Sequence, residues 1–354
     1  MKIAFIIGSL TGGGAERVVS ELANSFVENG NGVSIILVAN YKISYRIHED
    51  VSVVDATCPN AKPGTGTIAR IKKLHKLLKQ ENYDVILSFT TKVNNIVSIA
   101  HLGVKSKLVL CERNDPRFDP VERSERILRA ILYPKASGFV FQTEGERAFF
   151  SARIQKRSVV IPNPINPELP AVFKGVRSKR IVTATRLTMQ KNLKMAIDGF
   201  KILASVHPEF IFEIYGKGEL EAPLKEYVQE LGLASHVIFK GQSNNLYNEI
   251  ADASCFVLTS NYEGISNAML EAMALGIPTI STDYPSGGAR ESIENYKNGI
   301  IIPLNDSQTL GNELISLIEN SELQEKLSIN GEKIRDKYSL SKINRMWIDF
   351  IKNL

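Results

Sequence analysis

The feature that most constrains the fold is a regular alternation of short apolar runs with helical patterns along nearly the whole chain. The apolar runs are rich in Val, Ile and Phe, and they have the length of buried strands. Between them, apolar residues recur three and four positions apart, which predicts helices. This alternation is typical of parallel sheets covered by helices on both faces. We therefore predict an α/β chain built from doubly wound parallel sheets.

The expected strands form two series, separated by a segment with three prolines between residues 162 and 167. The first series is Lys2–Ile7, Val33–Val38, Val85–Ser88, Lys107–Cys111 and Gly138–Gln142. The second is Arg180–Ala184, Glu209–Tyr215, Val237–Lys240, Cys255–Leu258 and Thr279–Ser281. Because prolines favour a stiff, extended linker, we predict domains at residues 1–163 and 168–340, followed by a last helix at 341–354. Two such domains would place a ligand cleft between the carboxyl ends of their strands.

Composition excludes several classes of protein. Hydrophobic residues make up 44% and charged residues 23% of the 354 residues, an ordinary globular balance. No apolar run is long enough to span a membrane. The three cysteines lie far apart and show neither disulfide nor zinc spacing, so we expect free thiols in a reducing cytoplasm.

Charge is unevenly distributed between the two halves. Residues 1–163 carry a net charge of +8 and the remainder −3. Within the basic half, residues 56–80 hold six Lys and Arg and no acid. Ile68, Ile71, Leu74 and Leu78 fall on one arc of a helix there, and Lys72, Lys73, Lys76 and Lys79 fall on another. A basic amphipathic helix suits an anionic lipid surface or a lipid diphosphate, although an ordinary solvated face remains the alternative.

Two motifs indicate phosphate binding. The first strand is followed by a glycine loop that includes Gly12, Gly13 and Gly14 before a helix, a place where backbone N–H groups can approach an anion. The loop fits neither a Walker A nor a GxGxxG pattern, and a plain flexible turn remains possible. In the second half, Arg186 and Lys191 lie between a strand and a helix, where two cations could neutralise a diphosphate.

The most specific segment runs from Asn261 to Pro278 and contains Glu263 and Glu271. The two glutamates lie eight positions apart, about two helical turns, so they share a face. We expect Glu263 before the helix N-terminus and Glu271 inside the helix, where carboxylates can accept hydrogen bonds from a vicinal diol. The segment Gly264–Ala268 also imitates a hydrolase nucleophile elbow. A serine hydrolase of that kind needs a histidine later in the chain, and none occurs after His236. No D-x-D pair or ligand cluster is present, so we expect no dedicated metal site and no cofactor.

Together these motifs resemble retaining glycosyltransferases of family 4, which have the GT-B fold of two Rossmann-like domains. The resemblance covers essentially the whole chain and implies that the last helix crosses back to the first domain. It implies that Arg186 and Lys191 clamp the diphosphate of a nucleotide-sugar, that Glu271 binds the ribose and that Glu263 binds the donor sugar. It also implies that the backbone from Gly264 through Ile265 and Ser266 to Asn267 lines the sugar, and that Gly13 and Gly14 contact phosphates. Glu263, Arg186 and Lys191 are thus the expected catalytic residues.

In the first half the family pattern is incomplete. Arg113 stands where many relatives place a histidine after the fourth strand. An arginine cannot act as a general base, so we expect Arg113 to orient an acceptor phosphate or hydroxyl. Relatives that elongate undecaprenyl-diphosphate-linked glycans have a comparable basic helix, and we expect Lys72, Lys73 and Lys76 to contact lipid.

The sequence therefore predicts a cytoplasmic enzyme, peripheral at the inner face of a bacterial plasma membrane and without nucleic acid as a partner. The resemblance implies that it transfers a sugar from a UDP-sugar to a lipid-linked oligosaccharide in O-antigen, capsule or related glycan synthesis. Two alternatives stay open. One is a nucleotide-sugar 2-epimerase with the same architecture, and the other is a non-catalytic basic adaptor that binds an anionic polymer.

Overall fold

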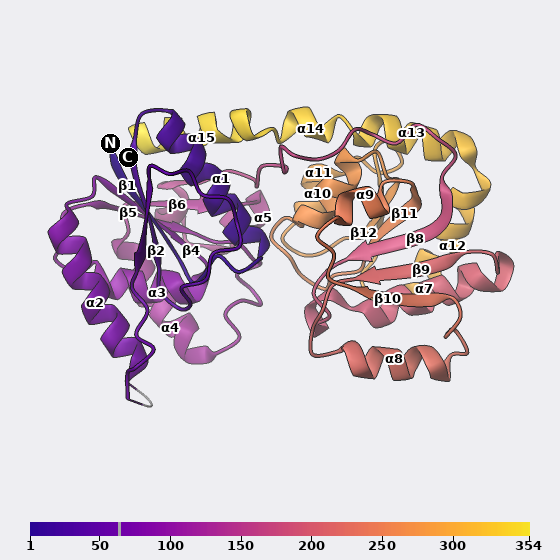
Figure 1. Cartoon of the computed structure of the whole chain (residues 1–354), viewed down its shortest axis with the longest axis horizontal. Coiled ribbons are helices and arrows are strands. Elements are labelled where there is room, and N and C mark those ends of the chain that lie inside the picture. Colours follow the sequence, from indigo (N-terminus) through magenta and orange to yellow (C-terminus); the bar gives the residue numbers. More distant parts are fainter. Residues whose placement is uncertain (63–64) are drawn as a thin grey trace. The chain divides into compact units, whose positions relative to one another are not determined.

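The computed structural model describes residues 1–62 and 65–354. The chain divides into two compact units, one of Met1–Pro164 with Leu340–Leu354 and one of Ile165–Ser339. Each unit is built around one parallel sheet (Figure 1). The sequence placed the corresponding boundaries at residues 163 and 168 and at 340, within a few residues of these divisions.

The sheet of the first unit has seven strands among the described residues, in the order β3-β2-β1-β4-β5-β6-β7. All neighbouring strands pair in parallel. The strands are β1 (Lys2–Ile7), β2 (Gly32–Leu37), β3 (Val51–Asp55), β4 (Val85–Phe89), β5 (Lys107–Cys111), β6 (Gly138–Phe141) and β7 (Ser158–Val160). The strand order changes direction between β1 and β4, so the loops after these two strands lead to opposite sides of the sheet.

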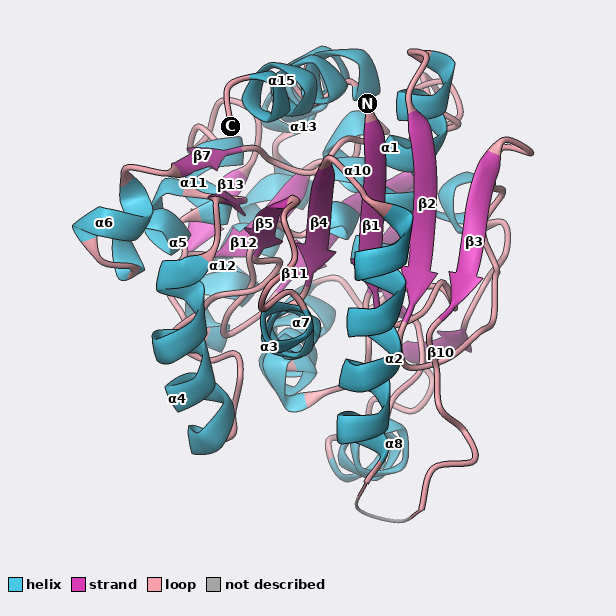
Figure 2. Cartoon of the chain, turned by 90° about the vertical axis from the view of Figure 1, so that its left-hand side faces the viewer, coloured by secondary structure: helices cyan, strands magenta, loops and turns pink. Residues whose placement is uncertain are grey.

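Helices cover both faces of this sheet. The helices α2 (Gly66–Glu81), α3 (Thr91–Ala100) and α4 (Arg123–Leu132) lie next to one another on one face (Figure 2). On the other face, α1 (Gly14–Glu28) contacts α15 (Leu340–Lys352), the last helix of the chain. Two short helices, α5 (Glu144–Phe149) and α6 (Ala152–Gln155), and one 3-10 turn, η1 (Tyr133–Lys135), flank β6 and β7. The last helix thus packs into the first unit, as the family resemblance implied.

The second unit repeats the arrangement with six described strands in the order β10-β9-β8-β11-β12-β13, all parallel. They are β8 (Ser178–Ala184), β9 (Ile211–Tyr215), β10 (Val237–Gly241), β11 (Ala253–Leu258), β12 (Thr279–Thr282) and β13 (Ile300–Ile302). The helices are α7 (Leu193–Val206), α8 (Glu221–Glu230), α9 (Leu246–Ile250), α10 (Asn267–Ala274), α11 (Gly288–Ser292), α12 (Ser307–Glu319), α13 (Ser321–Gly331) and α14 (Ile334–Lys337), with the 3-10 turn η2 (Met189–Lys191). The expectation of two doubly wound parallel sheets is confirmed.

Three strands were missing from the sequence prediction: β3, β7 and β13. Each lies at the edge of its sheet. Residues of β3 and β7 are mostly only half-buried, and β7 and β13 have three residues each, so neither a long apolar run nor a clear alternation marks them. The strand expected from Glu209 begins at Ile211 instead.

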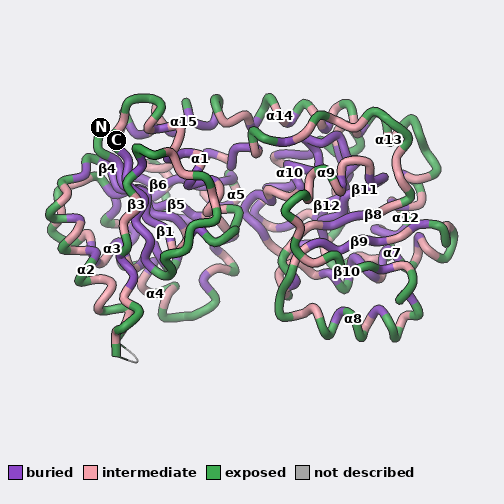
Figure 3. Tube along the Cα trace, viewed as in Figure 1, coloured by how far each residue is buried: buried purple, intermediate pink, exposed green. Residues whose placement is uncertain are grey.

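The apolar core of each unit lies between the sheet and its helices, with the strands buried at the centre (Figure 3). In the first unit, the Phe5 ring stacks on Phe89, and Phe89 lies against Trp347 of α15 at 5.9 Å between ring centroids. Trp347 is fully buried. The last helix is therefore a part of this core, because its largest side chain fills the sheet face beside α1.

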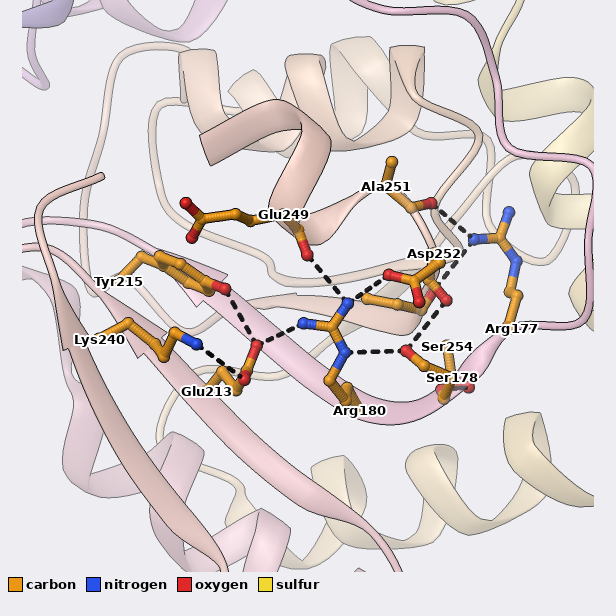
Figure 4. Close-up of polar contacts among 11 residues, drawn as sticks. Arg177, Ser178, Arg180, Glu213, Tyr215, Lys240, Glu249, Ala251, Asp252 and Ser254 are labelled. Atoms are coloured by element: carbon orange, nitrogen blue, oxygen red, sulfur yellow. Dashed lines mark hydrogen bonds and ion pairs between the residues drawn. The ribbon is translucent and has the colours of Figure 1, made fainter. Parts of the chain in front are cut away.

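An ionic network centred on the buried Glu213 crosses the second sheet on the face covered by α9 (Figure 4). Glu213 of β9 accepts hydrogen bonds from Arg180 of β8 at 2.6 Å, from the Tyr215 hydroxyl at 3.0 Å and from Lys240 of β10 at 3.4 Å. Arg180 also binds Asp252, just before β11. Since the donors and acceptors satisfy one another, the network links four neighbouring strand regions without leaving a buried charge unpaired.

We predict that Glu213→Leu destabilises the second unit strongly, because Arg180, Tyr215 and Lys240 lose their shared acceptor in a site only 6% exposed at the Glu213 side chain. Removing one partner of a buried ion pair costs about 3–5 kcal/mol. The measurement is the free energy of unfolding in urea. The matched control is Glu221→Leu, which breaks an exposed pair with Lys225 and should cost less than about 1 kcal/mol. Equal losses in the two variants would contradict a special role for the network.

Candidate active site

In the second sheet, the strand order changes direction between β8 and β11, which are paired neighbours. Loops that leave the carboxyl ends of strands at such a point diverge, and ligands of open α/β sheets bind in the resulting crevice. The loop after β8 carries Arg186 and Lys191, and the loop after β11 carries Glu263. The topology therefore brings together residues that lie some seventy positions apart in the sequence.

Lys191 and Glu263 form an ion pair, with the Lys191 ammonium against Glu263 Oε1. Their side chains are only 12% and 11% exposed. The Ser260 hydroxyl donates to the same Oε1 at 2.8 Å, and Gln190 Nε2 lies 3.4 Å from Oε2. The Glu263 carboxylate is thus oriented from three sides, and a partly desolvated charge pair of this kind interacts more strongly than it would in water.

The backbones of the two loops are joined by hydrogen bonds. The Asn261 N–H donates to the Gln190 carbonyl at 2.8 Å, and its side-chain amide donates to the Met189 carbonyl at 3.1 Å. The Thr259 hydroxyl donates to the Lys191 carbonyl at 3.0 Å. These bonds hold Lys191 beside Glu263 independently of the charges, so the position of the ion pair is set by the loop backbones.

The other donor-binding residues expected in the second unit lie in or next to the same loops. Arg186 is exposed at the end of β8, whereas Glu271 is buried inside α10 at 7% exposure. Ser266 caps α10, because its hydroxyl accepts the Met269 N–H at 3.4 Å. Glu263 precedes this helix and Glu271 lies within it, as the spacing predicted.

The segment from Gly264 to Asn267 is also fixed from the opposite side. The Ser286 hydroxyl donates to the Gly264 carbonyl at 3.0 Å. A Cβ atom on Gly288 would lie 2.1 Å from the same carbonyl oxygen, so only glycine fits there. The glycine turn before α11 therefore packs directly against the loop that carries Glu263.

Sequence reasoning missed some residues at this site. Gln190 and Ser260 orient Glu263, and nothing in their type or spacing indicates this before the loops are placed side by side. Gly216 and Gly218 follow β9, where added Cβ atoms would lie 1.8 Å from the Thr185 carbonyl oxygen and 2.3 Å from that of Leu187. Their Gly-x-Gly spacing after a strand was a visible signal of close backbone approach.

In the first unit, the glycine loop after β1 is held by an internal carboxylate. The Gly12 and Gly13 amides donate to Glu16 Oε2 at 2.7 and 2.9 Å, and the Ser9 hydroxyl donates to Oε1 at 2.5 Å. A phosphate at these two amides would have to displace Glu16. Phosphate contacts of Gly13 and Gly14 therefore stay a prediction.

Arg113 lies just after β5 and turns toward the interior. Its guanidinium lies 4.8 Å from the Phe89 ring centre and 5.5 Å from that of Trp347, and Nη1 donates to the Asn163 side chain at 3.2 Å. Its Nε and Nη2 atoms are buried. In this conformation Arg113 ties β5 to the end of the first unit and to α15, and its expected contact with an acceptor stays a prediction.

Buried carboxyl groups surround this region. Glu112 accepts hydrogen bonds from Thr91 at 2.6 Å and from Tyr133, and burial raises the pKa of Glu112. Glu146 Oε2 accepts the Gln142 N–H at 2.7 Å, and burial raises the pKa of Glu146 well above its usual value. Both acids are therefore biased toward their neutral forms in the folded protein.

The basic helix expected around residues 68–79 is confirmed as α2. Leu74 and Leu78 are buried, whereas Ile68 is 58% exposed. Lys72 and Lys76 are exposed, and the Lys73 ammonium donates to the Thr57 carbonyl at 3.0 Å. Lys73 thus supports the β3–α2 connection, while Lys72 and Lys76 point outward. Their contact with lipid stays a prediction.

Comparison with known proteins identifies the class. Residues 12–169 match the family model Glycosyltransferase Family 4, and residues 168–334 match Glycosyl transferases group 1. A Haemophilus influenzae protein described as an uncharacterized glycosyltransferase is 24% identical, over 98% of each chain. A Campylobacter jejuni alpha-1,4-N-acetyl-D-galactosaminyltransferase that acts on a diNAcBac-PP-undecaprenol-linked glycan is 28% identical, over 99% of this chain and 98% of its own.

Solved structures show the same fold. Anabaena HepE in complex with UDP superposes with a TM-score of 0.84 over the whole of both chains, at 20% identity. Staphylococcus aureus TarM superposes with a TM-score of 0.80 over 99% of this chain. The chain is a glycosyltransferase with the GT-B fold. Its first unit carries the Family 4 domain and its second unit the group 1 domain.

Within the described residues, no helix combines the length and apolar character needed to cross a bilayer.

We predict that Lys191 and Glu263 are energetically coupled. In a double-mutant cycle of Lys191→Met and Glu263→Gln, each single variant leaves a partly buried polar group without its partner. The double variant should therefore lose less stability than the two single variants lose together. The expected coupling is about 1–3 kcal/mol in the free energy of unfolding. The exposed pair of Lys297 and Glu294 provides the control cycle, with less than about 1 kcal/mol expected. Strict additivity at the first pair would contradict the interaction.

We also predict that Glu146 makes stability depend on pH. The pKa of Glu146 is raised in the folded state. The stability that its neutral carboxyl contributes is therefore fully present below the usual glutamate pKa of about 4.3, and it is lost as the pH rises through the pKa of the folded protein. Glu146→Gln stays neutral and keeps an acceptor for Gln142. The melting temperature of the variant relative to wild type should therefore rise from acidic to mildly alkaline pH. The control is Glu144→Gln, at a largely exposed neighbour, which should show no such trend. If the melting temperatures of Glu146→Gln and wild type changed with pH in the same way, the prediction would be wrong.

Proposed function

We propose that this glycosyltransferase moves a sugar from a UDP-sugar to a lipid-linked oligosaccharide, with retention of anomeric configuration, in bacterial surface-polysaccharide assembly such as O-antigen or capsule. The relatives support the substrate classes. Two Campylobacter enzymes at 28% and 27% identity act on undecaprenyl-diphosphate-linked glycans. The HepE structures were determined with UDP and with UDP-glucose.

The observation that carries the proposal is the oriented ion pair of Lys191 and Glu263 at the strand-order reversal of the second sheet. A carboxylate held by Ser260 and Gln190 can accept hydrogen bonds from sugar hydroxyls. The neighbouring ammonium can turn from the carboxylate to a phosphate oxygen without a large movement. A cation and an acceptor side by side match the two ends of a sugar diphosphate.

In the proposed reaction, the bond between the anomeric carbon and the diphosphate oxygen breaks, and an acceptor hydroxyl oxygen forms the new bond on the same face. The electron pair leaves with the diphosphate, and the acceptor proton passes to that leaving group. Lys191 and the exposed Arg186 neutralise the growing charge, and no dedicated metal is needed for this step. Glu263 holds the donor sugar and Glu271 the ribose.

We propose that the first unit binds the lipid-linked glycan acceptor. Its net charge of +8 over residues 1–163 favours an acceptor that carries a diphosphate and lies at an anionic membrane. The enzyme would then act as a peripheral protein at the inner face of the plasma membrane. Lys72 and Lys76, exposed on α2, are available for such contacts.

A panel of nucleotide-sugars tests the donor. UDP and one UDP-sugar should raise the melting temperature, since a ligand at one hundred times its dissociation constant adds about 2.7 kcal/mol to the free energy of unfolding.

Release of UDP should require a polyprenyl-diphosphate glycan, and chelation of divalent ions should leave the rate unchanged. Nuclear magnetic resonance of the product should show retention. Sugar conversion without acceptor would indicate a 2-epimerase instead, and polymer binding without donor binding would indicate an adaptor.

We expect Glu263→Ala to abolish transfer nearly completely while the circular dichroism spectrum and overall fold are preserved, because the sugar loses its oriented acceptor. The control is Glu322→Ala, an exposed glutamate on α13 of the same unit, which should retain wild-type rates. The measurement is acceptor-dependent UDP release. A Glu263→Ala enzyme with unchanged turnover would falsify the role assigned to this carboxylate.

A further inference from the structure

Helix α4 buries an arginine beside Leu132 and exposes two isoleucines on its outer side. Arg129 points inward and is 5% exposed, with its guanidinium donating to the Asp119 and Pro116 carbonyls at 2.8 Å. Ile127 and Ile131, one turn apart, are 61% and 58% exposed. An outward apolar stripe on a soluble helix is unusual, because surface helices normally bury such a stripe against the core.

Other exposed side chains extend the stripe into one surface. Val121, just before α4, is 73% exposed. Arg123 shares the helical face of Ile127 and Ile131, and Arg126 and Lys135 are also exposed. We call the set of Val121, Ile127, Ile131, Arg123, Arg126 and Lys135 the α4 surface. It combines exposed apolar side chains with exposed cations.

Acidic groups near the α4 surface are already engaged. Glu122 forms an ion pair with Lys92 at 3.0 Å, and Glu125 accepts a hydrogen bond from the Asn95 side chain at 2.5 Å. Glu125 keeps its negative charge, because an amide hydrogen bond does not neutralise a carboxylate, but Arg123, Arg126 and Lys135 outnumber it. The net charge of the surface is therefore positive. The surface is thus suited to an anionic partner.

Helix α2 lies in the same layer as α4, with α3 between them (Figure 2). Ile68, Lys72 and Lys76 follow one another at intervals of one turn on its exposed side. Both helices begin at the carboxyl edge of the parallel sheet, because each follows a strand that ends there. An exposed isoleucine and basic side chains therefore recur on both outer helices of one layer.

We propose that the α4 surface is a docking surface for an anionic lipid bilayer, in which Ile127, Ile131 and Val121 enter the interface while the cations contact headgroups. An apolar ridge bordered by Arg and Lys is the chemistry by which amphipathic helices bind such membranes. A second copy of this chain is a poorer occupant, since a symmetric interface would place the cations of one copy against those of the other.

This inference rests on the proposed function, because a lipid-linked acceptor gives the enzyme a reason to bind a membrane. It differs from the sequence-based expectation in assigning the apolar insertion to α4. The lysines of α2 then add long-range attraction from the same layer. The carboxyl edge of the first sheet, where both helices begin, would lie close to the lipid surface.

The test is flotation of the full chain with vesicles of phosphatidylcholine, with and without phosphatidylglycerol. Wild type should bind the anionic vesicles and lose binding as salt is raised. Ile127→Glu/Ile131→Glu should lower partitioning about tenfold or more. The matched control, Ile329→Glu at an exposed position of α13, should bind like wild type. Lys72→Gln/Lys76→Gln should weaken binding about fivefold per charge.

Two further measurements separate this inference from the proposed function. The Ile127→Glu/Ile131→Glu protein should keep the wild-type thermal shift with UDP and the wild-type rate on a short-chain, water-soluble acceptor. Vesicle binding without any transfer activity would refute the proposed function alone. Wild-type partitioning of the isoleucine variant, or absence of vesicle binding by an active wild type, would overturn the docking surface. So would a wild-type dimer in solution that the isoleucine variant converts to monomers.

Discussion

The burial of both faces of each parallel sheet is the constraint on which the rest of the structure depends. Helices cover the strands on either side, so polar groups that meet a ligand can leave the core only at strand ends. At the carboxyl ends of β8 and β11 the strand order reverses, and the loops separate there. Lys191 and Glu263 meet at this point, whereas the ionic network of Arg180 and Glu213 is confined beneath α9 and serves stability.

The candidate site is prepared by hydrogen bonds within the protein. Glu263 is held by Lys191 and Ser260, and in the other unit the amides of Gly12 and Gly13 are held by Glu16. The contacts of Glu263 and Ser260 satisfy polar groups that would otherwise be costly to bury, whereas the glycine amides lie in an exposed loop. A ligand that binds to these groups must therefore replace their internal hydrogen bonds with its own. Binding thus depends on how each loop is arranged.

The sequence predicted the long central strands well, because apolar runs of four or more residues and their flanking helical patterns are strong signals. It missed β3 and β7, whose residues are mostly half-buried at a sheet edge. It assigned Arg113 to an acceptor, and no residue pattern could show that its guanidinium lies against the rings of Phe89 and Trp347. The partners come from β4 and from the last helix, more than two hundred residues apart.

By itself, the sequence determined the class of fold, the position of the break between the two halves and the family motifs around Lys191 and Glu263, since these follow from local patterns and spacing. The tertiary structure alone decided which side chains face one another. It paired Lys191 with Glu263, buried Arg129 and turned Ile127 and Ile131 outward. The physical reason is that helix orientation and loop pairing depend on packing against distant elements, and a local pattern carries no record of those contacts.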